Sequence, residues 1–142
     1  MSCEIDHWIG HWVRKLNRNI VNLHDQKLMR FGVTASQVGV LAQLWKKDGL
    51  TQKELVRNLS IRPASLTGLV DSLLEKGYVS RKSDESDARS KRIYLTDKGR
   101  ELEGISLSII EEMEALLSKG FSEEEKQLLL CWLNKLYRNL EN

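Results

Sequence analysis

The sequence contains few features of a secreted or membrane protein. Its 142 residues include two cysteines and one proline, and no apolar run approaches the roughly 18 residues of a membrane-spanning helix. The N-terminal stretch carries Glu4 and Asp6 without an apolar block, unlike a signal peptide. Cys3 and Cys131 lie too far apart to suggest a disulfide framework. We therefore expect a cytoplasmic protein that does not enter a membrane.

Residues typical of catalytic or metal sites are also scarce. His7 and His11 have a spacing that can place two metal ligands on one helical face, but no acidic or thiol side chain completes a set. No nucleophile elbow, phosphate loop or paired carboxylates can be recognised. We expect no enzyme, no metal and no cofactor. A metal-dependent enzyme using the two histidines is a rival hypothesis, and stoichiometric zinc or iron in the purified protein would favour it.

The net charge of +2 is unevenly distributed along the chain. Residues 1–50 carry +3, residues 51–100 carry +4 and residues 101–142 carry −5. A basic middle and an acidic end are typical of a protein whose central part faces nucleic acid. An ordinary solvated surface explains the same pattern.

Apolar spacing and capping signals predict a mainly helical chain. Apolar residues recur every three or four positions over residues 4–30 and 97–119, which predicts two long amphipathic helices. Capping boxes, in which a hydroxyl and a Glu or Gln side chain satisfy each other's backbone amides, predict helices beginning after Thr34, Thr51 and Ser122.

Residues 51–96 predict a winged helix. Pro63 fits the first position of a second short helix and Gly77 the position just past its end, so two helices flank a tight turn. Apolar and polar residues then alternate over 78–82 and 91–96, which predicts two strands. The loop between them, residues 83–90, has no large apolar residue and is expected to project. A helix-turn-helix followed by a hairpin indicates DNA binding.

This stretch resembles the MarR (multiple antibiotic resistance regulator) family of transcription regulators. The resemblance covers about a third of the chain and is carried by Thr51-Gln52, Glu54-Leu55, Leu69-Val70-Asp71, Leu74-Glu75, Gly77, Asp87-Ala88-Arg89, Lys91-Arg92, Leu95-Thr96 and Gly99. At position 88 the family often has a basic residue instead of alanine. The resemblance implies one MarR-like domain over 1–142, with a winged helix-turn-helix at 34–96 and helical dimerisation parts at 1–33 and 97–142.

The predicted DNA contacts lie at the start of a recognition helix, on the wing and at the start of the helix that follows Thr51. The start of a recognition helix presents side chains to base edges in the major groove, and a wing arginine suits a narrow minor groove. Asp87 is placed to pair with an arginine and hold its direction. The resemblance puts Arg89 at the wing tip, and neighbouring basic residues are expected at phosphates. The predicted DNA-binding residues are Gln52, Arg62, Pro63, Ala64, Ser65, Thr67, Arg81, Lys82, Asp87, Arg89, Lys91 and Arg92.

The terminal helices carry apolar stripes that the small winged helix cannot cover. Pairing of the chain ends around a two-fold axis would bury them, as the resemblance also implies. A monomer with folded-back terminal helices is the competing hypothesis. The predicted dimer contacts are Ile5, Trp8, Ile9, Trp12, Leu129, Trp132, Leu133, Leu136 and Leu140.

Together these features predict a homodimeric repressor. It would bind a pseudo-palindromic operator with half-sites about one helical turn apart. The resemblance implies release by a small aromatic or lipophilic effector whose binding residues are unknown. Activation instead of repression stays open. The sequence also fits a redox-sensing regulator that uses Cys3 or Cys131, and it fits a winged-helix protein-interaction module that does not bind DNA.

Overall fold

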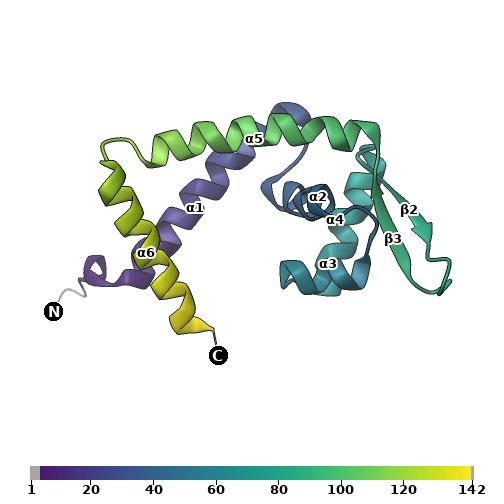
Figure 1. The fold of residues 1–142 in the computed structure, drawn as a ribbon, viewed down its shortest axis with the longest axis horizontal. Coiled ribbons are helices and arrows are strands. Elements are labelled where there is room, and N and C mark those ends of the chain that lie inside the picture. Colours follow the sequence, from purple (N-terminus) through teal and green to yellow (C-terminus); the bar gives the residue numbers. More distant parts are fainter. Residues whose placement is uncertain (1–3, 142) are drawn as a thin grey trace. The chain divides into compact units, whose positions relative to one another are not determined.

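The computed structural model describes residues 4–141 and is mainly helical with one small sheet (Figure 1). It divides into two compact units, the first ending at Ile109 and the second beginning at Ile110. The predicted mainly α fold with a β-hairpin wing is confirmed. None of the helices in the described part of the chain is long and apolar enough to cross a membrane.

The first long helix, α1, spans Ile9–Leu28 and is shorter than predicted. Ile5–His7 form a separate 3-10 turn, and Trp8 between the two has an extended backbone with φ −95° and ψ 125°. The indole N–H of Trp12 donates to the carbonyl of Asp6 at 2.7 Å and holds this turn against the helix. The prediction of one continuous helix over 4–30 was wrong, because apolar spacing continues through Trp8 and does not reveal the backbone break.

Three short helices form the helical part of the winged helix: α2 (Ala35–Lys46), α3 (Gln52–Leu59) and α4 (Pro63–Glu75). The capping boxes predicted before α2 and α3 are confirmed. In the second box, the hydroxyl of Thr51 accepts from the amide of Glu54 at 3.1 Å, and the Glu54 carboxylate accepts from the amide of Thr51 at 2.8 Å. The turn between α3 and α4 places Ser60 in the left-handed region with φ 52°.

The sheet has three antiparallel strands in the order β1–β3–β2. The predicted strands correspond to β2 (Val79–Ser83) and β3 (Lys91–Leu95), and we call the hairpin they form, residues 79–95, the wing. The strand β1 (Leu50–Thr51) was not predicted, because a strand of two residues shows no alternation. Leu50 lies opposite Ile93, and both side chains are buried.

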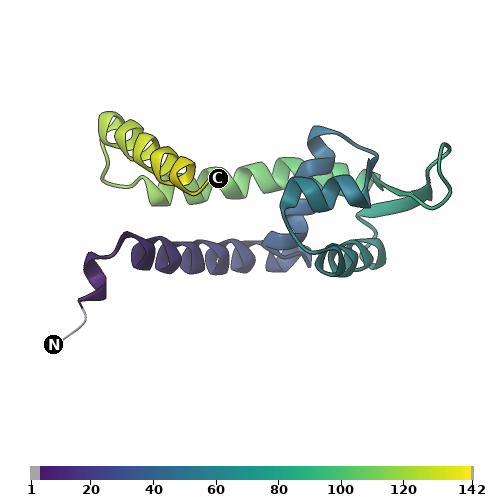
Figure 2. The same ribbon diagram turned by 90° about the horizontal axis from the view of Figure 1, so that it is seen from below.

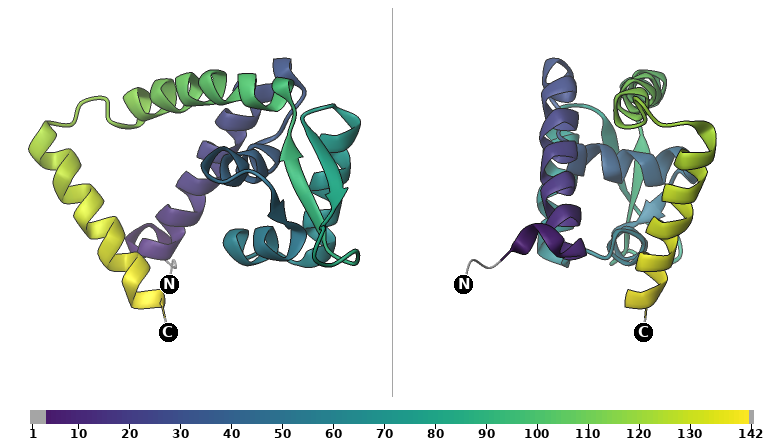
Figure 3. Two further views of the ribbon diagram at one scale, coloured as in Figure 1. Left: turned by 45° about the vertical axis from the view of Figure 1, so that its right-hand side comes forward. Right: turned by 90° about the vertical axis from the view of Figure 1, so that its left-hand side faces the viewer.

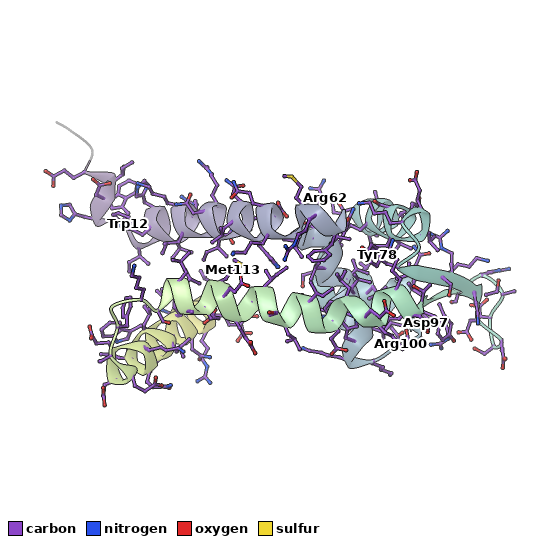
Figure 4. The ribbon with its side chains drawn as sticks, turned by 90° about the horizontal axis from the view of Figure 1, so that it is seen from above. Trp12, Arg62, Tyr78, Asp97, Arg100 and Met113 are labelled. Carbon is purple, nitrogen blue, oxygen red and sulfur yellow. The ribbon has the colours of Figure 1, made fainter. Side chains whose placement is uncertain are left out.

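Aliphatic side chains from the helices and the sheet form the core of the first unit. Its fully buried large side chains include Leu28, Leu41, Leu44, Leu55, Leu66, Leu73 and Ile93. Tyr78 closes one side of this core, beside the start of α5 (Asp97–Leu117), where Figure 4 labels Asp97 and Arg100. The Tyr78 hydroxyl donates to the carbonyl of Phe31 at 2.6 Å, and burial raises the pKa of this phenol.

Replacing Gly99 with alanine is expected to destabilise the first unit by about 1–3 kcal/mol, the usual range for overpacking a core. A Cβ atom at this position would collide with the backbone carbonyl of Tyr78, which cannot rotate away. Gly104, on the same helix, has open space around the corresponding position. Gly104→Ala is the control and should raise stability by up to about 1 kcal/mol through helix propensity. Thermal unfolding measures both, and equal effects of the two substitutions would contradict the prediction.

His24 on α1 is half-buried and has one enclosed polar atom. Its Nε2 atom is inaccessible and has no hydrogen-bond partner within residues 4–141. Burial lowers the pKa of this imidazole, and the neighbouring carboxylate of Asp25 offsets the shift in part. The folded state therefore holds His24 neutral at a pH where the unfolded chain already binds a proton.

Folding stability should consequently fall as the pH drops below about 6.5, the ordinary pKa of histidine. The stabilisation that comes from neutral His24 is complete above a pH of about 6.5. It is lost as the pH falls from there through the lower pKa that His24 has in the folded state. A His24→Gln variant should lose less stability than the wild type on acidification. Urea unfolding at neutral and mildly acidic pH measures this. His7→Gln, at a histidine whose side chain is 77% exposed, is the control.

The second unit contains the end of α5 and the last helix, α6 (Glu123–Leu140). The capping box of Ser122 and Glu125 is confirmed, with hydrogen bonds of 3.1 and 3.0 Å. Gly120, with φ 85°, lies between the helices. No residue of α6 is buried, although the helix is rich in leucine. Its exposed large apolar side chains are Leu128, Leu129, Leu130, Trp132, Leu133, Tyr137 and Leu140.

Candidate DNA-binding interface

The wing tip and the N-terminal end of α4 lie on the same side of the first unit (Figure 3, left). The chain reverses at Gly77, whose φ of 79° permits a tight turn, so β2 runs back along α4. An ion pair fixes the two elements together, because the guanidinium of Arg81 lies 2.8 Å from the carboxylate of Asp71. Figure 2 shows that the hairpin loop projects beyond the helices of this unit.

The start of α4 is open to solvent. Arg62 is its N-cap residue with an extended backbone, and its side chain makes no capping hydrogen bond. Pro63 occupies the first turn as predicted. The side chains of the predicted base-reading residues Arg62, Pro63, Ala64, Ser65 and Thr67 are all exposed. The hydroxyl of Thr67 donates to the carbonyl of Pro63 at 3.0 Å, within the helix itself.

Backbone hydrogen bonds order the wing tip. The amide of Asp84 donates to the carbonyl of Ser90 at 2.9 Å, and the amide of Ser90 donates to the carbonyl of Asp87 at 3.0 Å. The Asp87 carboxylate accepts from the backbone amide of Arg89 at 2.9 Å. The prediction that Asp87 pairs with an arginine side chain was wrong, because its oxygen caps this local turn instead. The Arg89 side chain is exposed and has no acidic partner in the described part of the chain.

Next to the hairpin loop, Arg92 on β3 makes contacts within the protein. One of its nitrogens donates to the carbonyl of Gly49 at 2.8 Å, and the other lies 3.2 Å from the carboxylate of Asp84. The bond from Arg92, with those from Ser86, lowers the pKa of Asp84, and the same carboxylate raises the pKa of Arg92. The role of Asp84 was not predicted, because it is one of three acidic residues in the loop, with Glu85 and Asp87, and its spacing does not distinguish it from them. The guanidinium of Arg92 is already engaged by Gly49 and Asp84. A contact between Arg92 and a DNA phosphate stays a prediction.

The remaining predicted DNA-contact residues lie on the two strands of the wing and at the start of α3. Lys82 and Lys91 are exposed on the two strands; the first ammonium lies 5.3 Å from the Tyr94 ring centroid and the second donates to the Ser83 hydroxyl at 3.0 Å. Gln52 is the first residue of α3 and is half-buried. The structure therefore places two candidate DNA-contacting elements on one side of the first unit. One is the start of α4 with its small side chains, and the other is the projecting hairpin loop with Arg89.

Comparison with known proteins identifies the chain. The model of the MarR family matches residues 33–91, which include the helix-turn-helix and most of the wing. YdgJ of Bacillus subtilis (strain 168), an uncharacterised HTH-type transcriptional regulator, is 31% identical over 111 residues, covering 78% of this chain and 68% of YdgJ. The chain belongs to the MarR family. It is thus a MarR family transcription regulator with the fold that the resemblance implies.

Solved structures of MarR proteins match almost the whole chain. A MarR transcriptional regulator from Methanosarcina mazei Go1 has a TM-score of 0.85 and 29% identity, with 93% of this chain and 95% of that chain covered. MepR of S. aureus, solved in a complex with DNA, has a TM-score of 0.85 and 31% identity, with coverage of 93% and 98%. A protein of this fold has therefore been seen on DNA.

The residues behind the metal and redox hypotheses belong to parts of the chain other than the winged helix. His7 and His11 each face a nearby carboxylate, Glu4 at 3.0 Å and Asp6 at 3.6 Å. No group of three or more metal-binding side chains occurs within the described residues. Cys131 is free and exposed on α6, and Cys3 lies outside the described residues. Redox sensing stays an untested hypothesis.

Proposed function

We propose that this MarR family regulator is a homodimer that recognises a pseudo-palindromic DNA operator in the cytoplasm and acts as a ligand-responsive repressor. The observation that carries the proposal is the exposed start of α4 beside the ordered wing that presents Arg89. A helix start suits base edges in the major groove, and a flexible cation on a projecting loop suits the minor groove. The DNA complex of MepR supports the same use of this fold.

The exposed apolar stripes support a homodimer. Trp8, Ile9 and Trp12 have exposed fractions of 61%, 62% and 46%, and Trp132 and Leu133 have 55% and 46%. Each of these two segments thus carries large exposed apolar side chains, and clusters of such side chains mark association sites. A second copy would cover the predicted contact residues, and a two-fold axis would present two reading surfaces to two half-sites.

Ligand response belongs to the same proposal. In the proposed dimer, the start of α4 and the wing of each subunit form one DNA-binding surface. An effector that binds better to the conformation with one spacing of these two surfaces shifts the population towards that conformation. If that spacing does not fit both half-sites, the protein leaves the operator. A small aromatic or lipophilic molecule is the proposed class of effector, and release from the operator is the proposed response.

Selection from randomised duplexes followed by fluorescence anisotropy tests the proposal. We expect an inverted repeat to be enriched, and we expect the full-length protein to bind it far more tightly than random duplex. The affinity should fall steeply with salt, because bound phosphates release counterions. Candidate effectors can then be added to the same complex. Failure to bind any duplex at low salt would contradict the proposal and favour the protein-interaction module.

A further inference from the structure

The outward face of α4 consists almost entirely of small residues. Helical periodicity places Ala64, Thr67, Gly68 and Asp71 on this face, opposite the buried Leu66, Val70 and Leu73. Arginine, lysine, asparagine and glutamine, which read base edges through hydrogen bonds at the end of a long side chain, are absent from this face of α4. Contact between this face and bases must therefore be close and must use short groups.

Part of the hydrogen-bonding capacity of this face is used within the protein. The hydroxyl of Thr67 donates to the carbonyl of Pro63 at 3.0 Å, and the carboxylate of Asp71 is held by Arg81 at 2.8 Å. One carboxylate oxygen of Asp71 is thus used within the protein. Thr67 has no hydroxyl proton left to donate to a base, so it offers its γ-methyl and a hydroxyl oxygen that can only accept.

A second methyl group lies beside it. Ala64 precedes Thr67 by three residues, so the two side chains are neighbours on the helix surface. Gly68 adds no side chain, and the space beyond its backbone is open, which lets a binding partner approach closely. The outward face thus presents a small apolar patch, made of Ala64 and the methyl of Thr67, in the middle of a polar surface.

In the major groove of DNA, the apolar group among the base edges is the 5-methyl of thymine. We propose that each half-site contains a thymine whose 5-methyl group packs against the γ-methyl of Thr67 and the side chain of Ala64. This inference rests on the proposed DNA-binding function. It makes Thr67 a specificity-determining residue that acts through its methyl group, with its hydroxyl serving the helix.

Single replacement of thymine by deoxyuridine in the selected operator is the direct test, because it removes one methyl and leaves the hydrogen-bonding edge unchanged. Burial of one methyl predicts an affinity loss of about fourfold at one position in a half-site, and about fifteenfold when both half-sites are changed. Other thymines outside the reach of α4 should show little effect. Fluorescence anisotropy measures the dissociation constants.

Two matched variants separate the methyl from the hydroxyl. Thr67→Val keeps a methyl and loses the hydroxyl, so it should retain the deoxyuridine penalty. Thr67→Ser keeps the hydroxyl and loses the methyl, so its deoxyuridine penalty should be clearly smaller than that of the wild type, with Ala64 supplying what remains. Circular dichroism confirms that both variants are folded.

The outcomes distinguish this inference from the function on which it rests. If no duplex is bound specifically, the proposed function fails. Specific binding without a thymine-sensitive position, or a penalty that is undiminished in Thr67→Ser, overturns only the methyl contact. Loss of discrimination in Thr67→Val but not in Thr67→Ser would identify the hydroxyl as the reader and would also overturn it.

Discussion

Replacing Arg89 with alanine is expected to weaken binding to the selected operator by roughly a hundredfold. A charge-assisted hydrogen bond contributes about 1.5 kcal/mol, and a two-fold symmetric dimer loses it at both wings. The wing should keep its shape, because Asp87 binds the backbone amide of residue 89 and not its side chain. Anisotropy titrations at several salt concentrations should also show a shallower salt dependence, by about one unit of slope for each lost phosphate contact.

Arg138→Ala is the matched control for Arg89→Ala. It removes one exposed arginine from α6, on the side of that helix opposite Trp132 and Leu133, and leaves the winged helix unchanged. Its affinity for the operator should stay within about twofold of the wild type, since long-range effects of single surface charges are screened at physiological salt. If Arg89→Ala binds as tightly as this control, the wing does not read DNA in the proposed way.

Replacing Trp132 with glutamate is expected to convert the dimer into a monomer. The Trp132 side chain is 55% exposed in the single chain, and we propose that the second copy covers it. The two-fold axis would bring the new carboxylate into the interface twice, and burying an unpaired charge is strongly unfavourable. Sedimentation velocity measures the change in mass. Operator affinity should fall by about two to four orders of magnitude, because two linked reading surfaces no longer bind together.

Asn134→Glu introduces the same carboxylate at an exposed position of α6, on the side of the helix away from the predicted contact residues Trp132 and Leu133. This variant should remain a dimer and keep its operator affinity. The first unit has its own core, so Trp132→Glu should still give the helical spectrum of a folded protein. A Trp132→Glu protein that stays dimeric would show that this stripe is not the dimer contact.

The local elements of the winged helix could be predicted because their signals span few residues. Thr51 and Glu54 meet within one helical turn, so their capping box is visible in the sequence and appears in the structure. Pro63 and Gly77 mark the ends of α4 for reasons of backbone conformation alone. The polar loop of the wing followed from the absence of large apolar side chains. The candidate DNA-contact residues were chosen on the same local basis.

What those residues can do depends on contacts between distant parts of the chain. Arg81 and Arg92 looked alike as basic wing residues, but Asp71 engages the first, and Gly49 with Asp84 engages the second. The spacing of charges along the sequence could not distinguish them from Arg89, which remains unpaired within the described residues.

The sequence by itself therefore determined which segments are mainly helical, where the helices with capping boxes begin, and which family they form. The tertiary structure decided which polar groups remain available to a partner. Asp48, for example, accepts a hydrogen bond from the amide of Leu95 at 2.8 Å, 47 positions along the chain. The physical reason is that helix caps and turns depend on neighbouring residues, whereas the pairing of a charged side chain depends on what the folded chain places within about 3–4 Å of it.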